Sequence, residues 1–154
     1  MNVWKMSAKP ADHRSVREGA SLGLVIATSI WIWLAIVDAL VGQPFHTFTV
    51  LGGALRFTAF HYLLNVVYGI AVVSLIHAGL RAPGLLFAVL LGSLVIEFAF
   101  MMLTVLLSQL GLGELAWVRI LGGNLIGAAV GWSILLRTHP VRELLRDAEA
   151  EENE

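Results

Sequence analysis

Four long runs of apolar residues, separated by short polar or glycine-containing breaks, dominate the pattern along the chain. A bilayer core of about 30 Å is crossed by roughly 20 helical residues, because each residue of an α-helix adds about 1.5 Å. Each run reaches that length, and none shows the strict alternation of a membrane β-strand. We therefore predict four transmembrane helices, at about residues 20–42, 57–78, 85–107 and 114–136.

The same pattern predicts how these helices are arranged. A soluble helical bundle would need polar outer faces, and the four runs have almost none. The second and third breaks are short, so consecutive helices should be antiparallel neighbours. The first run is longer than a signal-peptide core and ends without a convincing cleavage site, so we expect it to be retained. The predicted fold is all-α, an antiparallel four-helix bundle embedded in a membrane.

Lysine and arginine near the ends of the runs predict the orientation. Eight of them fall on one side of the membrane: Lys5, Lys9, Arg14, Arg17, Arg81, Arg137, Arg142 and Arg146. Only Arg56 falls on the opposite side. Both termini are therefore expected in the cytoplasm of a bacterial cell, with the chain in its inner membrane. The predicted parts are a cytoplasmic flank (1–19), a membrane domain (20–136) and a charged cytoplasmic tail (137–154).

Composition narrows the classes of function. Charged residues make up 14% of the chain, against about 25% in a soluble domain. A net charge of −1 offers no basic surface for nucleic acid. Cysteine is absent, which excludes disulfides and thiolate chemistry. The sequence also has neither a glycine-rich phosphate loop nor a serine nucleophile elbow, so it gives little support to an enzyme.

Three ionisable residues are predicted to share one depth near the outer ends of their helices: Asp38, His61 and Arg119. At about 1.5 Å per residue, each lies roughly 6–8 Å below the outer boundary. Ionisable groups inside a membrane are costly, so each is a candidate functional residue. In one interpretation Asp38 and Arg119 form a structural pair, or Arg119 reaches outward to headgroups. In the other, the three residues bind a polar group and His61 exchanges a proton.

A second polar layer is expected near the middle of the membrane, formed by Asn65, Glu97 and Asn124. Polar side chains should face the interior of the bundle, because lipid offers no hydrogen-bond partner. A protonated Glu97 bonded to Asn124 or Asn65 would act as a packing clasp. Alternatively, Glu97 is a proton-relay carboxyl whose pKa is raised by burial.

Gly123, Gly127 and Gly131 form a glycine zipper along the last predicted helix. Glycine at this spacing allows a second helix to approach closely. Whether that helix belongs to this chain or to another is left open by the sequence. Two tryptophans in the first helix, Trp31 and Trp33, point to nearly opposite sides, so we expect one to face protein and the other lipid.

Neither haem nor a metal ion is predicted. A b-type haem in a bundle needs two facing histidines from different helices, and only His61 is clearly embedded on the outer side. A metal site formed by Asp38, His46 and His61 would lack the usual ligand spacing.

Most of the chain resembles small four-span bacterial membrane proteins of unknown function. The residues that carry the resemblance are Trp33, Val37-Asp38, Gly42-Gln43-Pro44-Phe45, Thr47, Leu51-Gly52, Phe60-His61, Tyr68-Gly69, Glu97, Gly123-Asn124-Leu125 and His139-Pro140. The resemblance implies no activity.

These patterns lead to a predicted function and an alternative. The prediction is a non-enzymatic accessory or structural subunit, which contacts the lipid bilayer and packs through its glycine zipper against other membrane subunits or a second copy. The alternative is a small oligomeric transporter or proton-coupled channel that uses Glu97 and the layer of Asp38, His61 and Arg119. A membrane-embedded enzyme or cofactor binder ranks third.

Overall fold

The computed structural model describes residues 13–79, 92, 95, 99, 102, 106 and 108–138. Within these residues the regular structure is entirely helical. Three helices are long and apolar enough to cross a membrane: Ser15–Leu40, Ala54–His77 and Gly113–Thr138. Their length and composition indicate a membrane protein, and they coincide with the first, second and fourth predicted spans. The third predicted span, 85–107, lies almost wholly outside the described residues.

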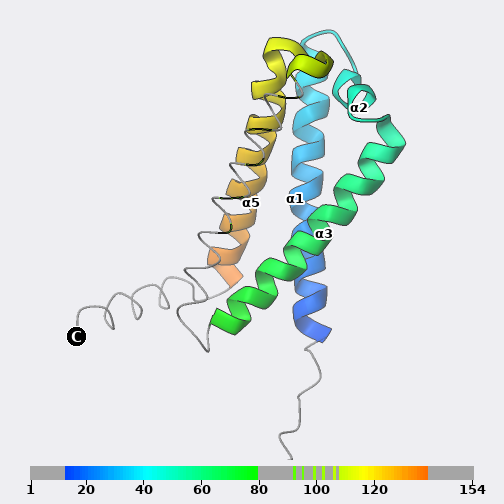
Figure 1. The fold of residues 1–154 in the computed structure, drawn as a ribbon. Helices are drawn as coiled ribbons and strands as arrows, with labels where there is room; N and C mark the ends of the chain where they lie inside the picture. The colour runs from blue at the N-terminus through cyan, green and yellow to red at the C-terminus, as the bar shows by residue number, and fades with distance from the viewer. Residues whose placement is uncertain are drawn as a thin grey trace, which may run out of the picture.

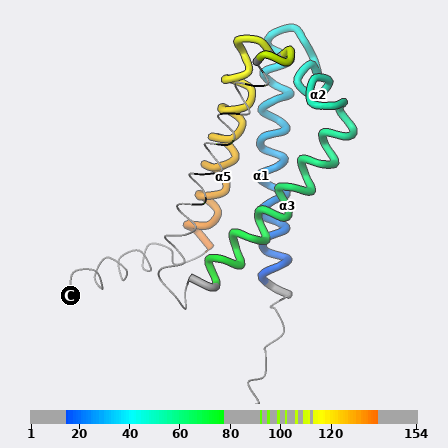
Figure 2. Tube along the Cα trace, in the orientation of Figure 1, coloured from blue at the N-terminus to red at the C-terminus, as the bar shows by residue number. Residues whose placement is uncertain are grey.

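The helix α1 (His13–Leu40) is the centre of the described structure. It packs against α3 (Ala54–Gly79) and against α5 (Gly122–Thr138), which flank it (Figure 1). Figure 2 shows that α1 runs antiparallel to both neighbours, so the start of α1 lies at the same end as the ends of α3 and α5. The short helix α2 (His46–Val50) covers the opposite end.

Glycines bring the backbones of α1 and α3 into direct contact. A Cβ atom added to Gly19 would lie 2.5 Å from the Cα atom of Ile70, and one on Gly23 would overlap the carbonyl of Asn65. On α3, a Cβ atom at Gly69 would overlap the carbonyl oxygen of Gly19. The two helices can therefore cross at this distance only because these three positions have no side chain.

The glycine zipper of α5 packs against α1 of the same chain. Gly123, Gly127 and Gly131 are all buried. A Cβ atom on Gly127 would lie 2.7 Å from Cδ1 of Ile30, and one on Gly131 would lie 2.9 Å from Cδ1 of Ile26. The sequence left open which helix meets this face, and in the described structure it is α1 of the same chain.

A substitution at Gly127 tests this packing. We expect Gly127→Leu to lower the free energy of unfolding by about 1–3 kcal/mol, because the added side chain must displace Ile30 from a filled interface. Thermal unfolding in mild detergent measures the effect. Gly92→Leu is the matched control, since a Cβ atom there meets no atom of the described residues within 4 Å. Equal stability of the two variants would show that α5 does not use this face against α1.

The ends of the predicted elements differ from the observed ones. The helix α1 begins at His13, within the predicted flank, and α3 begins at Ala54 rather than residue 57. The predicted loop after the first span contains α2, which has only five residues and is too short to show a helical period. The last span begins irregularly, with η1 (Ser108–Leu112), η2 (Gly113–Leu115) and η3 (Trp117–Leu121) before α5.

Candidate functional site

The carboxylate of Asp38 lies fully buried at the end of α1, with an exposed fraction of 0%. The backbone N–H of Thr47 donates to its Oδ2 atom at 2.7 Å, and the Thr47 hydroxyl donates to Oδ1 at 2.6 Å. Thr47 lies in α2 and is itself buried. The acid therefore fastens α2 to the end of α1.

Arg119 reaches the same carboxylate from η3. Its Nε atom donates to Oδ1 of Asp38 at 2.9 Å, and the exposed fractions of the two side chains are 1% and 0%. A second guanidinium nitrogen donates to Oε1 of Gln43 at 3.4 Å. Arg119 sits in a π-helical turn, and such a turn rotates the following side chains relative to a regular α-helix. We call Asp38, Gln43, Thr47 and Arg119 the outer clasp.

Local backbone geometry builds this clasp. The backbone N–H of Gln43 donates to the carbonyl oxygen of Asp38 at 2.9 Å, which closes the end of α1. Gly42 (φ 71°) and Phe45 (φ 61°) adopt left-handed conformations on either side of Pro44. These turns fold the chain back, so that α2 starts over the buried carboxylate.

The charges within the outer clasp neutralise each other, because Arg119 forms an ion pair with Asp38. A carboxylate offers about four acceptor positions, and three hydrogen bonds from Thr47 and Arg119 occupy most of those of Asp38. A buried acid and base that neutralise each other avoid the cost of an isolated buried charge. The arrangement can therefore join helices, but it presents no open acid, base or anion site.

His61 is separate from the outer clasp, although the sequence placed it at the same depth. Its Nε2–H donates to the carbonyl oxygen of Ala27 at 3.0 Å, because a carbonyl can only accept. Its other ring nitrogen faces the amide of Asn65 at 3.3 Å, and the ring of Phe57 stacks on it with centroids 5.2 Å apart. His61 thus joins α3 to α1. The structure brings together Asp38 and Arg119, but not His61.

Aromatic side chains surround this region. The ring of Phe48, with an exposed fraction of 0%, lies 5.1 Å from Trp31 and 5.4 Å from Phe57, measured between centroids. The indole N–H of Trp31 donates to Thr58, and that of Trp33 donates to the carbonyl oxygen of Val118 at 2.9 Å. Both indole N–H groups therefore bond within the chain, and both side chains are half-buried. The expected division into one protein-facing and one lipid-facing ring stays a prediction.

The mid-membrane layer is only partly described. Asn65 donates to the carbonyl oxygen of His61 at 2.9 Å, one turn away on α3. The side-chain nitrogen of Asn124 is buried and has no hydrogen-bond partner within the described ranges. Glu97, the third member, lies outside the described residues.

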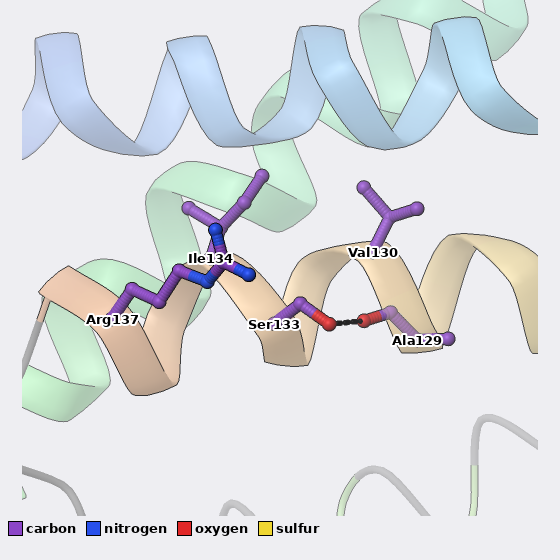
Figure 3. A pocket seen from close by; sticks show the side chains of 5 residues that line it. All are labelled: Ala129, Val130, Ser133, Ile134 and Arg137. Atoms are coloured by element: carbon purple, nitrogen blue, oxygen red, sulfur yellow. Dashed lines mark hydrogen bonds between the residues drawn. The ribbon is translucent and has the colours of Figure 1, made fainter.

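Two grooves lie on the described helices. The smaller one is about 300 Å³, and the described residues that line it all belong to α5: Ala129, Val130, Ser133, Ile134 and Arg137 (Figure 3). Here the Ser133 hydroxyl donates to the carbonyl oxygen of Ala129 (Figure 3). The larger one is about 560 Å³ and lies between α1, α3 and α5. Neither groove is lined by the outer clasp. Among the described residues, no three His, Asp or Glu side chains are grouped so that they could hold a metal ion.

Sequence reasoning assigned no role to two members of the outer clasp, Gln43 and Thr47. It also missed Gly69 as a packing position. The sequence does contain a signal for Thr47. Its hydroxyl group follows Asp38 by nine positions, and the loop between them contains the turn-forming residues Gly42 and Pro44, which can bring the two side chains together.

Comparisons of the chain with protein-family models, with curated proteins and with solved structures found no match. The site itself is therefore the basis for a functional proposal.

Proposed function

We propose that the protein is a non-enzymatic integral membrane protein, an accessory or structural subunit of a larger membrane assembly. The observation that carries this proposal is the outer clasp. Its acid and base are buried, neutralise each other and join α1, α2 and η3. Charged residues used in this way stabilise a bundle, whereas a transport or catalytic site needs charged groups that remain accessible to a substrate.

The proposal places four spans in a bacterial inner membrane with both termini in the cytoplasm. The antiparallel course of α1, α3 and α5 supports this placement (Figure 2), and the lysine and arginine distribution gives its direction. Reporter fusions at residue 154 and within 43–56 should report opposite compartments, with residue 154 inside. A periplasmic signal at residue 154 would contradict the four-span topology.

In this proposal, other subunits contact the outer faces of the helices, because α1 already covers the glycine zipper. The helix α3 offers a broad apolar surface, to which the largest contributions come from Leu55, Phe60, Leu63, Leu64 and Val67. Lipid and a neighbouring subunit can both cover such a surface, because each is apolar.

Gentle solubilisation tests the proposal. The tagged chain, extracted from its native membrane in mild detergent, should migrate with other membrane proteins at a fixed stoichiometry. The assembly should survive a second, orthogonal purification step. A chain that runs alone, as a monomer or as a homo-oligomer, would contradict an accessory role.

The buried amide of Asn124 favours one alternative, a small oligomeric transporter or proton-coupled channel. Its nitrogen lies near the start of α5 and close to the middle of the span Gly113–Thr138, without a hydrogen-bond partner among the described residues, as expected of a polar group that meets a substrate. Glu97 would then carry protons in the same layer.

Glu97→Gln separates the two functions, since glutamine keeps the shape and hydrogen-bonding capacity of glutamate but cannot titrate. For an accessory subunit we expect the variant to match the parent in thermal stability and assembly. Proton flux into proteoliposomes should be at background for both. Flux in the parent that Glu97→Gln abolishes, in a folded protein, would favour the channel.

A further inference from the structure

The groove between α1, α3 and α5 is lined by residues near the start of α1 and near the end of α5. These two helix ends lie at the same end of the described structure (Figure 1). All three helices contribute to its walls: Arg17, Glu18, Ser21, Leu22 and Val25 from α1, Val73 from α3, and Ile134, Leu135 and Thr138 from α5. Its volume of about 560 Å³ exceeds that of the shallow groove on α5.

The groove changes character along its length. Its charged residues, Arg17 and Glu18, lie close to the start of α1. Its apolar floor is formed by Leu22, Val73 and Leu135, which are buried with exposed fractions of 4%, 0% and 5%. Val25, which is 42% exposed, lies about 12 Å from Arg17 along the helix at 1.5 Å per residue. A groove with a charged mouth and an apolar interior fits an amphiphile whose long axis is parallel to the helices.

The polar groups at the mouth have capacity for a ligand. Arg17 is exposed and forms no ion pair with any residue in the described ranges. The hydroxyl of Ser21 is likewise available as a donor. Glu18 already has an interaction, but a carboxylate has about four acceptor positions and can accept further hydrogen bonds. The Thr138 hydroxyl donates to the carbonyl oxygen of Ile134.

We infer that this groove binds one zwitterionic aminophospholipid. Its phosphate lies at Arg17 and Ser21, its ammonium group lies at Glu18, and one acyl chain follows Leu22 and Val25. Among the described residues that line the groove, one side chain is positive and one is negative, which matches a headgroup with both charges. A lipid with only a negative charge would be attracted by Arg17 and repelled by Glu18.

The inference goes beyond the proposed subunit role and does not depend on it. The proposed orientation determines only the leaflet, which is the cytoplasmic one. If the chain proves to have no partner subunits, the lipid site is unaffected. If the lipid site proves absent, the proposed assembly is unaffected.

Lipid retention tests the site. The full chain is placed in nanodiscs with equal amounts of phosphatidylethanolamine and phosphatidylglycerol, released into mild detergent, and weighed by native mass spectrometry. The parent should retain one phosphatidylethanolamine. Arg17→Gln should weaken retention roughly tenfold, the effect of one charge-assisted hydrogen bond. Glu18→Gln should shift the preference toward phosphatidylglycerol.

Blocking the apolar part gives an independent test. Val25 is 42% exposed and lines the groove, so Val25→Phe should fill it without disturbing the buried core and should abolish retention. Val67→Phe is the matched control, because Val67 is exposed on α3 and lines neither groove. Arg137→Gln is the control for charge, since Arg137 lines only the shallow groove.

Any one of three results for the parent and the Val25→Phe variant would overturn the inference. They are a parent that retains no lipid, a parent that prefers phosphatidylglycerol, and a folded Val25→Phe variant that retains lipid as the parent does. Thermal unfolding of each variant establishes that it is folded. Equal loss of retention in the two controls would also overturn it, because the effect would then be independent of this groove.

Discussion

Asp38→Asn is expected to lower the free energy of unfolding by about 3–5 kcal/mol, because Arg119 would keep its charge in a buried position without a counter-ion. The exposed fractions of 0% for Asp38 and 1% for Arg119 leave no solvent to compensate. Asparagine can still bond Thr47, so the loss reports mainly the missing charge. Denaturant unfolding in detergent measures it.

Glu114→Gln is the matched control for Asp38→Asn. Glu114 is an exposed acid at the same end of the molecule, and its neutralisation should change stability by less than about 0.5 kcal/mol. A stability for Asp38→Asn equal to that of the control would mean that the buried pair contributes nothing to the fold.

Gly23→Leu should have the second large effect, a loss of about 3 kcal/mol or more. Overpacking typically costs about 1–3 kcal/mol when side chains can adjust. At Gly23 the added atoms would meet the backbone of Asn65 and Val66, which cannot rotate away. The variant should therefore be less stable than Gly127→Leu, whose obstacle is the flexible side chain of Ile30.

The smallest change at the crossing is also informative. Gly23→Ala should destabilise the protein, although alanine is the better helix former by about 1 kcal/mol. Gly92→Ala provides the control, because its Cβ atom meets no atom of the part of the chain that the structure describes within 4 Å, and the gain in helix propensity remains. If Gly23→Ala proves as stable as Gly92→Ala, α1 and α3 do not cross at Gly23.

The sequence was sufficient for the features that depend on composition and helical spacing. The spans at about 20–42, 57–78 and 114–136 correspond to helices, because apolar length alone determines whether a segment can cross a membrane. The close approach at Gly123, Gly127 and Gly131 follows from their spacing, which places them on one face. The identity of the helix that packs against this glycine face could not be predicted, because residue spacing does not show which helix lies opposite.

The outer clasp shows why the rest could not be predicted. Depth along a helix placed Asp38, His61 and Arg119 at one level, but it does not give the direction in which each side chain points. His61 turns to the carbonyl oxygen of Ala27, while Arg119 is aimed at Asp38 from a π-helical turn. Thr47 reaches the carboxylate only after two left-handed residues reverse the chain, which is a property of backbone angles and not of pattern.

The most direct test of the central claim, that the outer polar residues hold the helices together, is a double-mutant cycle of Asp38→Asn and Arg119→Gln. Free energies of unfolding of the parent, both single variants and the double variant are measured in one detergent. Two residues in contact should give a coupling energy of about 0.5–3 kcal/mol, with the double variant recovering part of the loss caused by Asp38→Asn. Additive effects of the two substitutions would contradict the claim, because they would show that the two side chains do not meet.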